Sequence, residues 1–284
     1  MRRHPRACRR AETGDARRRQ GKSETGGHVA GHLDAAVGAA REGRRVVGGL
    51  PHGRAGRQDA EEIVSAALQS RTAFILANTS VLTPPHVPEI RLHLADEAHD
   101  LWHRTEEELE TIGLPPPFWA FAWAGGQGLA RHILDAPESV RGRRVLDLAS
   151  GSGLVAIAAA MAGATSVTAN DIDPFSEAAV ALNARVNAVE PSFDNRDLTG
   201  DPALAASFDV VLAGDVFYDR ELAGALTPWL QNLAEAGKTV LVGDPGRAYL
   251  PKERLEAMSV HEVAVTRALE DMEVKRTTVW RFAA

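Results

Sequence analysis

The stretch VLDLASGSG, Val145 to Gly153, decides the fold that the sequence predicts. It indicates a buried strand that runs into a loop with glycines at 151 and 153, and the following GLVAIAAAMAGA predicts a helix. Glycines at such a turn let backbone amides approach a ligand where the N-terminus of the helix offers positive partial charge. A tight strand-to-helix turn without a ligand is the structural alternative.

Outward from this loop, apolar strands alternate with helical segments. Downstream of RRVLDLA, the predicted strands are SVTANDI, FDVVLAGD and KTVLVGDPG, and PSFDNRDL is a short strand or a loop. The predicted helices are PFSEAAVALNARVNAV, ELAGALTPWLQNLAEAG and LPKERLEAMSV, and HEVAVTRALE with KRTTVWRFA predicts an antiparallel edge hairpin. Strands at helix-separated intervals indicate a mostly parallel sheet covered on both faces, so we expect an α/β, Rossmann-like doubly wound domain.

Three regions are expected along the chain. Residues 1–60 show no periodicity and predict a disordered tail or a start codon placed too far upstream, with a mitochondrial transit peptide or a nucleic-acid-binding arm as alternatives. Residues 129–284 predict the ligand-binding α/β domain. Residues 61–128 predict a helical and extended substrate-side segment, made of a helix from about Asp59, an extended TPPHVPEIRLHLA, a charged helix EAHDLWHRTEEELETIG and an aromatic loop LPPPFWAFAWAGGQ.

Composition narrows the classes of partner. The first 60 residues carry fourteen Lys or Arg against six Asp or Glu, so the other 224 carry 18 against 32, and this acidity argues against nucleic acid as the substrate. Cys8 is the single cysteine, which excludes an internal disulfide, and the ten histidines show no metal-ligand spacing, so we expect no metal. The longest apolar run, 154–164, is too short for a bilayer. We expect no membrane segment and a cytoplasmic location, or the mitochondrial matrix in a eukaryote.

Asp147 helps to distinguish between two candidate ligands of the glycine loop. GSGLVA satisfies the dinucleotide pattern G-x-G-x-x-A, with Asp171 twenty residues on, so an NAD-dependent oxidoreductase is one interpretation. Asp147, however, lies inside the strand, where a buried carboxylate needs a cation, and S-adenosyl-L-methionine supplies an ammonium group. The carboxylate of that cofactor would meet the loop amides, its ribose diol Asp171, and its adenine Ile172. A salt bridge from Asp147 to Arg143 or Arg144 is the structural alternative.

Several motifs together resemble a known family. VLDLASGSG, NDIDP and GDVFYD look like the class I S-adenosylmethionine-dependent methyltransferases, whose seven-stranded sheet ends in an antiparallel strand. Within that class PPFWAFAWAGGQGLARHIL, ANDIDP, GDVFYD and GDPGR, in this order and spacing, resemble the electron transfer flavoprotein beta-subunit lysine methyltransferases. The resemblance covers roughly residues 70 to 284 and implies a protein lysine N-methyltransferase that acts on that beta subunit. Ala149 departs from the class, in which many members carry glycine at this position.

The resemblance also implies site residues. Asp215 and Tyr218, a strand-end D-x-x-Y, would be catalytic, and Trp123 would lie near the cofactor. A methyltransferase of a ribosomal protein or of a small amine, and a pseudoenzyme that binds cofactor and a partner, remain alternatives. The expected cofactor-binding set is Trp123, Asp147, Ser150, Gly151, Gly153, Asp171, Ile172 and Asp215.

The two acids of the stretch GDVFYD are expected to have different roles, one in catalysis and one in helix capping. We expect Asp215 to orient the lysine amine, Tyr218 and Phe217 to form aromatic walls, and Asp219 to cap the following helix. In the alternative, Asp215 caps that helix and Phe217 packs in the core.

Two further residues are expected on the substrate side. Trp119 could line the acceptor site or pack in the core, and Arg247 could meet an acidic partner or form a salt bridge within its loop. The expected substrate-binding set is therefore Trp119, Phe217 and Arg247.

Overall fold

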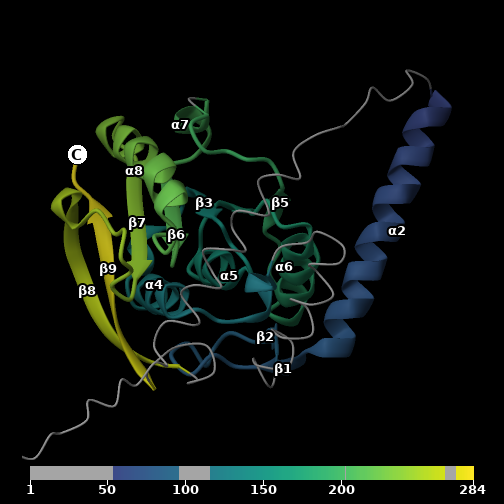
Figure 1. Ribbon diagram of the computed structural model, residues 1–284, viewed down its shortest axis with the longest axis horizontal. Coiled ribbons are helices and arrows are strands. Elements are labelled where there is room, and N and C mark those ends of the chain that lie inside the picture. Colours follow the sequence, from purple (N-terminus) through teal and green to yellow (C-terminus); the bar gives the residue numbers. More distant parts are fainter. Residues whose placement is uncertain (1–53, 96–115, 202, 266–272) are drawn as a thin grey trace, which may run out of the picture.

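A computed structural model describes residues 54–95, 116–201, 203–265 and 273–284 of the chain. The first described element is a long helix, α2 (Arg54–Asn78), which packs against α6 (Pro174–Val186) and extends beyond it, away from the sheet (Figure 1). A small antiparallel pair follows, made of β1 (Ser80–Leu82) and β2 (Leu92–Leu94). The described part of this N-terminal segment therefore packs against α6 of the α/β domain.

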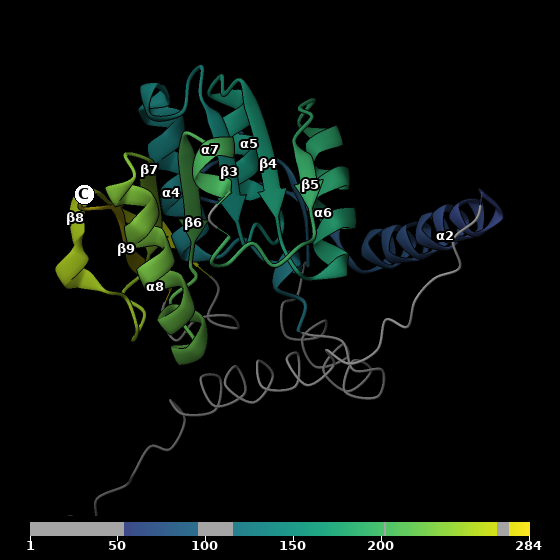
Figure 2. The same ribbon diagram turned by 90° about the horizontal axis from the view of Figure 1, so that it is seen from above.

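The central sheet has seven strands in the order β5-β4-β3-β6-β7-β9-β8. The first five in this order are parallel, whereas β9 runs antiparallel between β7 and β8. Figure 2 shows the strands side by side from β8 at one edge to β5 at the other. The predicted fold class is confirmed, including the antiparallel C-terminal edge. The strands are β3 (Arg144–Leu148), β4 (Ser166–Asn170), β5 (Ser192–Asp194), β6 (Val210–Gly214), β7 (Thr239–Asp244), β8 (Leu255–Ala264) and β9 (Val274–Phe282).

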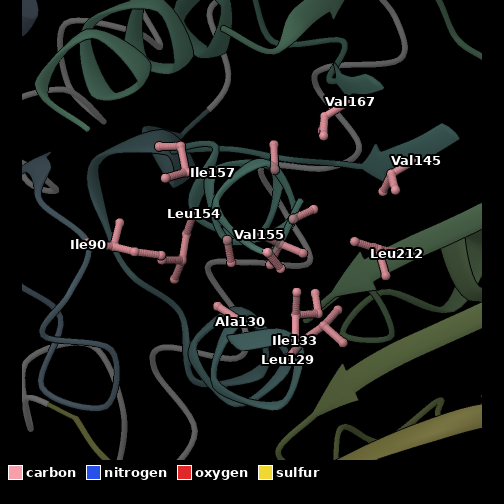
Figure 3. Packing of buried hydrophobic residues seen from close by; sticks show 14 of the residues in the cluster. Ile90, Leu129, Ala130, Ile133, Val145, Leu154, Val155, Ile157, Val167 and Leu212 are labelled. Carbon is pink, nitrogen blue, oxygen red and sulfur yellow. The ribbon is translucent and has the colours of Figure 1, made fainter. Parts of the chain in front are cut away.

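Alternating side chains of the central strands feed two cores, one on each face of the sheet. On β6, Val210 and Leu212 pack with α4 (Ala124–Asp135) and α5 (Leu154–Met161), whereas Val211 and Ala213 pack with α8 (Arg220–Glu235). Figure 3 shows the first core, where Leu129 and Ile133 of α4 lie near Leu212. The period of two along a strand that is buried on both faces explains its uninterrupted apolar sequence. The remaining helical turns are η1 (Phe118–Ala120), η2 (Pro137–Ser139), α7 (Leu204–Ser207) and η3 (Lys252–Arg254).

Two aspartates start the helices that follow β4 and β6. Asp173 accepts a hydrogen bond from the Phe175 amide at 2.9 Å, with Pro174 in the first helical position of α6. Asp219 accepts from the Leu222 amide at 2.8 Å and begins α8, so the predicted capping role of Asp219 is confirmed. These caps satisfy amides that no helical carbonyl can reach.

The helix predicted for LPKERLEAMSV is wrong. Only Lys252–Arg254 forms a helical turn, and strand β8 begins at Leu255. Leu, Glu, Ala and Met favour a helix locally, but the free edge of β9 offers backbone partners, and pairing with it overrides local propensity. A register shift between Ala257 and Ser259 also breaks the alternation by which the strand could have been recognised.

The boundaries of other elements differ less from those that the sequence predicted. The helix expected from Asp59 begins at Arg54, and the aromatic loop contains the η1 turn and ends where α4 begins at Ala124. The tail expected at 1–60 was therefore wrong for residues 54–60, which are helical. Residues 1–53 of that tail and the charged helix expected at 97–113 lie outside the described residues.

Helix α4 begins in close contact with the ends of β6 and β7, and glycines make this contact possible. A Cβ atom on Gly125 would lie 2.7 Å from the Asp215 nitrogen and 2.9 Å from the Asp215 Cβ, and would also overlap the Gly243 oxygen. Likewise, a Cβ atom on Gly214 would lie 2.9 Å from the Cα of Gly126. Because these neighbours are mostly backbone, no side chain can be accommodated by a simple rotamer change.

We expect Gly125→Ala to lower the free energy of unfolding by about 2 kcal/mol or more, because the added methyl group forces α4 away from the sheet. The matched control is Gly224→Ala on α8, where an added Cβ meets nothing within 4 Å. That change should raise the free energy of unfolding by about 0.5–1 kcal/mol, because alanine favours helix. Urea unfolding measures both, and equal stabilities for the two variants would contradict the packing described for Gly125.

Candidate active site

The glycine loop after β3 is held in an unusual backbone conformation. Ala149, Gly151 and Gly153 all have positive φ, at 53°, 50° and 79°. The Ser150 amide donates to the Asn170 oxygen at 2.9 Å and the Gly153 amide to the Ser150 oxygen at 2.8 Å, which ties the loop to the end of β4. The backbone conformation also explains why glycine is favoured at the position of Ala149, because a Cβ raises the energy of the left-handed region.

Asp171 and Ile172 lie beside this loop, at the carboxyl end of β4. The Asp171 carboxylate accepts from the Gly151 amide at 2.8 Å through Oδ2 and from the Asp173 amide at 2.9 Å through Oδ1. Ile172 is 66% exposed, which is unusual for a large apolar side chain. The predicted ribose and adenine positions are therefore adjacent, and Ile172 offers an uncovered apolar surface.

Asp147 is buried beneath the glycine loop, at 1% exposure. Its Oδ2 accepts a hydrogen bond from the Ala156 amide at 2.9 Å in the first turns of α5. Burial raises the pKa of Asp147 to about 8, and the nearby Asp171 carboxylate raises it further, while the Ala156 hydrogen bond opposes the shift. Arg144, one of the two arginines considered as a partner, instead pairs with Asp209 at 2.8 Å. Within the part of the chain that the structure describes, Asp147 thus lacks the counter-charge that its burial demands.

The aromatic loop before α4 covers the glycine loop. A Cβ atom on Gly151 would lie 3.7 Å from the Phe118 oxygen, and the Trp123 indole donates to that same oxygen at 3.0 Å. The ring of Phe118 lies 5.8 Å from Trp123 and 5.7 Å from Tyr218 between centroids. Phe118 therefore links the expected cofactor loop to the expected catalytic tyrosine. It was missed because the sequence places four aromatic side chains together in this loop without showing which one faces the strand ends.

Trp119 and Phe217 do not lie where the sequence analysis expected them. Trp119 is 2% exposed and stacks on Phe175, with centroids 5.6 Å apart and ring planes at 10°. Phe217 is fully buried in the core beneath α8. The packing of both residues fits the core alternative, and their roles on the substrate side stay predictions.

Asp215 stands at the carboxyl end of β6 with both oxygens engaged. Its Oδ2 accepts from the Gly125 amide at 2.9 Å, and its Oδ1 pairs with Arg247 Nε at 2.5 Å. The residue has a φ of 62°, and its own amide donates to the Gly243 oxygen at 2.8 Å. Asp215 therefore caps α4 from across the sheet and does not cap α8. Arg247 forms the salt bridge that the sequence analysis left open, with a partner from the neighbouring strand.

Asp244, at the end of β7, is a site residue that the sequence analysis missed. Its Oδ1 accepts from the amides of Gly246 at 2.6 Å and Arg247 at 2.8 Å, whereas its buried Oδ2 has no hydrogen-bond partner. Burial raises the pKa of Asp244 to about 6, with a further contribution from the charge of Asp215. The signal was present, because GDPGR and GDVFYD both place Gly-Asp at the end of a strand.

Tyr218 is half-buried. Its ring contacts Phe118, and the carboxylates of Asp171, Asp215 and Asp219 lie close enough to act on its phenol. Burial raises the pKa of its phenol well above the usual value, and the carboxylates of Asp171, Asp219 and Asp215 act in the same direction. Tyr218 therefore keeps its proton at physiological pH and can serve as a hydrogen-bond donor but not as a base.

The residues around the glycine loop fit S-adenosyl-L-methionine. Ser150 Oγ is buried without a hydrogen-bond partner, Asp147 is buried without a counter-charge, and Ile172 is an exposed apolar surface. A methionine carboxylate, a methionine ammonium and an adenine ring would match these three features. Among the described residues, no group of His, Cys, Asp and Glu side chains could hold a metal ion. Within the same ranges, no helix combines the length and apolarity needed to cross a membrane.

Comparison with known proteins decides the family. Residues 132–218 match the family described as ribosomal protein L11 methyltransferase (PrmA). The electron transfer flavoprotein beta subunit lysine methyltransferase of Xenopus laevis is 40% identical over 216 residues, which span 74% of this chain and 86% of that protein. The chain belongs to the electron transfer flavoprotein beta subunit lysine methyltransferase family.

A second relative agrees with this membership. The Rattus norvegicus member of the family is 42% identical over 178 residues, covering 62% of this chain and 68% of that protein. Among solved structures, the ribosomal protein L11 methylase of Lactobacillus delbrueckii subsp. bulgaricus has a TM-score of 0.40 at 21% identity, covering 57% of this chain and 80% of that one. A TM-score this low says nothing about function. The family implies S-adenosyl-L-methionine as the methyl donor, in line with the fit of the site residues.

We expect Asp147→Asn to stabilise the ligand-free protein at pH 8 and to weaken cofactor binding. Because the folded pKa is about 8 against 3.8 for an ordinary aspartate, wild-type stability is full below pH 4 and falls as the pH rises towards 8. Asparagine does not ionise and can still accept from Ala156. The melting temperature at pH 8 should therefore rise by about 4 °C or more, with no difference near pH 4.

Affinity for S-adenosylhomocysteine should fall by about 10-fold in the same variant, because the methionine ammonium loses a charged partner. Asp209→Asn is the control, since Asp209 pairs with Arg144 and its pKa is depressed by that pairing. It should lose stability at neutral pH and keep its affinity. An Asp147→Asn variant that melts like wild type at pH 8 would contradict the burial argument.

Proposed function

We propose that the chain is an S-adenosyl-L-methionine-dependent protein lysine N-methyltransferase that acts on the electron transfer flavoprotein beta subunit. The observation that carries the proposal is the chain of contacts from Gly151 through Phe118 to Tyr218, which puts a strand-end D-x-x-Y beside the cofactor loop. Identity of 40% over 86% of the Xenopus laevis relative supports the choice of acceptor.

The chain's own residues align two reactants and desolvate an amine. When bound, S-adenosyl-L-methionine supplies a methyl group activated by a positively charged sulfur. The Ser150 hydroxyl in the glycine loop would hold the carboxylate of that cofactor. Asp147 would hold its ammonium, Asp171 its ribose hydroxyls, and Ile172 with Trp123 its apolar parts. Fixing both reactants within the crevice at the strand ends converts a bimolecular reaction into an effectively unimolecular one.

A free lysine of pKa about 10.4 enters the site protonated at neutral pH, and it must release that proton to solvent before its nitrogen can attack the methyl group. The half-buried site around Tyr218 lowers that pKa by desolvation. Asp215, fixed by Arg247 and by the Gly125 amide, directs its remaining lone pairs at the amine, and the protonated Tyr218 phenol orients it. Phe118 takes the place expected for Phe217 as the aromatic wall, where a ring face attracts the incoming cation.

A ribosomal protein is the second candidate acceptor, because residues 132–218 match the ribosomal protein L11 methyltransferase family. That match spans the cofactor-binding part and ends at Tyr218, so it carries less information about the acceptor than the longer match to the beta-subunit enzymes. The acidic balance after residue 60 disfavours nucleic acid as a substrate. A cytoplasmic location, or the mitochondrial matrix in a eukaryotic host, would give access to the flavoprotein.

Incubation with radiolabelled S-adenosyl-L-methionine tests the acceptor directly. The purified protein is offered the flavoprotein beta subunit, ribosomal protein L11 and a cofactor-depleted cell extract in separate reactions. We expect label on a lysine of the beta subunit, located by mass spectrometry. Label on ribosomal protein L11 alone would select the second candidate, and label confined to small molecules would exclude a protein substrate. Calorimetric titration that finds binding of NAD and none of S-adenosylhomocysteine would refute the whole class.

Substitutions in GDVFYD test the roles of its residues. We expect Asp215→Asn to lower kcat/KM by about 100-fold, because Arg247 loses its partner and the amine loses a charged acceptor, and Tyr218→Phe to lower it by about 10-fold. Asp219→Asn is the matched control, because asparagine caps a helix as well as aspartate does. Its activity should equal that of wild type. Unchanged methyl transfer in both active-site variants would remove Asp215 and Tyr218 from the mechanism.

A further inference from the structure

Asp215 and Asp244 form a pair of carboxylates at the ends of two neighbouring parallel strands. Gly214 of β6 is in register with Gly243 of β7, so the two aspartates occupy equivalent positions, one residue further on. Arg247 joins them, since its side chain binds Asp215 and its amide binds Asp244. The pair lies at the carboxyl edge of the sheet, and Asp215 and Arg247 are close enough to Tyr218 for their charges to act on its phenol.

This pair has more negative charge than its surroundings neutralise. Among the described residues, the charged groups that act on Asp244 are Asp215 from β6 and Arg247 from the following loop, and the Gly125 amide of α4 binds Asp215 instead. The guanidinium of Arg247 is therefore shared by two carboxylates. It already binds Asp215, with 2.5 Å between Arg247 Nε and Asp215 Oδ1. Asp244 is 1% exposed, yet its Oδ2 has no hydrogen-bond partner. A buried charged oxygen without a donor is rare in folded proteins and indicates a position that a ligand completes.

The ligand that matches has one positive charge and a free N–H donor. An alkylammonium group has both, and it is compact enough to reach an oxygen beside the Arg247 guanidinium. A second guanidinium would need a planar, bidentate acceptor, and Asp244 presents only one open oxygen because Oδ1 already accepts two amides.

We propose that Asp244 is a substrate-binding residue whose Oδ2 accepts a hydrogen bond from the ammonium group of the acceptor lysine as it enters the site. This inference rests on the proposed lysine methyltransferase function and extends it. Binding of the cation at Asp244 selects a charged amine over a neutral hydroxyl or amide, and it places the nitrogen beside Asp215 and Tyr218. Arg247 keeps Asp215 occupied, so that the incoming amine and the arginine do not compete for one carboxylate.

Steady-state kinetics with the flavoprotein beta subunit at saturating S-adenosyl-L-methionine tests the proposal. Because Asp244 loses its proton near pH 6, the wild-type KM for the beta subunit should be constant from pH 6.5 to 8 and rise about 10-fold per unit as the pH falls below about 6. In Asp244→Asn, KM at pH 7.5 should be raised about 10-fold or more and should not vary with pH between 5 and 8. The kcat of that variant at pH 7.5 should stay within about 3-fold of wild type.

Two controls distinguish a loss of substrate binding in Asp244→Asn from a general change in the folded structure. Asp209→Asn changes an aspartate that also pairs with an arginine, at the other end of the sheet, and should keep the wild-type KM profile. The affinity of Asp244→Asn for S-adenosylhomocysteine should match wild type within about 2-fold, which shows a folded cofactor site.

A wild-type KM that does not change between pH 5 and 7.5 overturns the proposal even if the Asp244→Asn variant fails to fold. Wild-type kinetics in the variant overturn it too, while leaving the methyltransferase function intact. A wild-type protein that binds S-adenosylhomocysteine but labels no lysine overturns the proposed function, and the role of Asp244 with it.

Discussion

The site depends on the contact between the first turn of α4 and the ends of β6 and β7. Gly125 allows the helix to approach, and Asp215 holds it there by accepting the Gly125 amide across the sheet. The same aspartate orders Arg247, and Arg247 in turn fixes the loop that contains Asp244. One carboxylate thus joins a helix, two strands and a loop, so catalytic geometry and local packing cannot vary independently here.

The parts of the site that the sequence predicted share one property, which is that they are local. Asp219 caps the helix that directly follows it, and the glycine loop lies between a strand and helix that are adjacent in sequence. Apolar runs of the central strands indicated burial on both faces, and this was sufficient to predict a parallel sheet. Local hydrogen bonding and periodicity depend only on residues that are close together in the sequence, so a single sequence reveals them.

What the sequence did not reveal depends on partners that are distant along the chain. Asp244 lies in GDPGR, and only the register of β7 with β6 places it beside Asp215. Trp119 and Phe217 have the side chains of an acceptor pocket, and only their neighbours in the fold show that both are core residues. The segment after Leu255 has helix-forming side chains, but the exposed edge of β9 determines its conformation. Tertiary pairing outweighed composition in each case.

The buried acids beneath the glycine loop and at the strand ends have a consequence for the life of the protein in a cell. Asp147 and Asp244 are each desolvated at a position where a cationic ligand is expected, so the folded chain without ligands carries an electrostatic penalty. Ligands that bind only the folded state lower its free energy by mass action. Supply of methyl donor and acceptor would therefore govern how much of the chain escapes unfolding and proteolysis, and the abundance of the enzyme would follow the availability of its substrates.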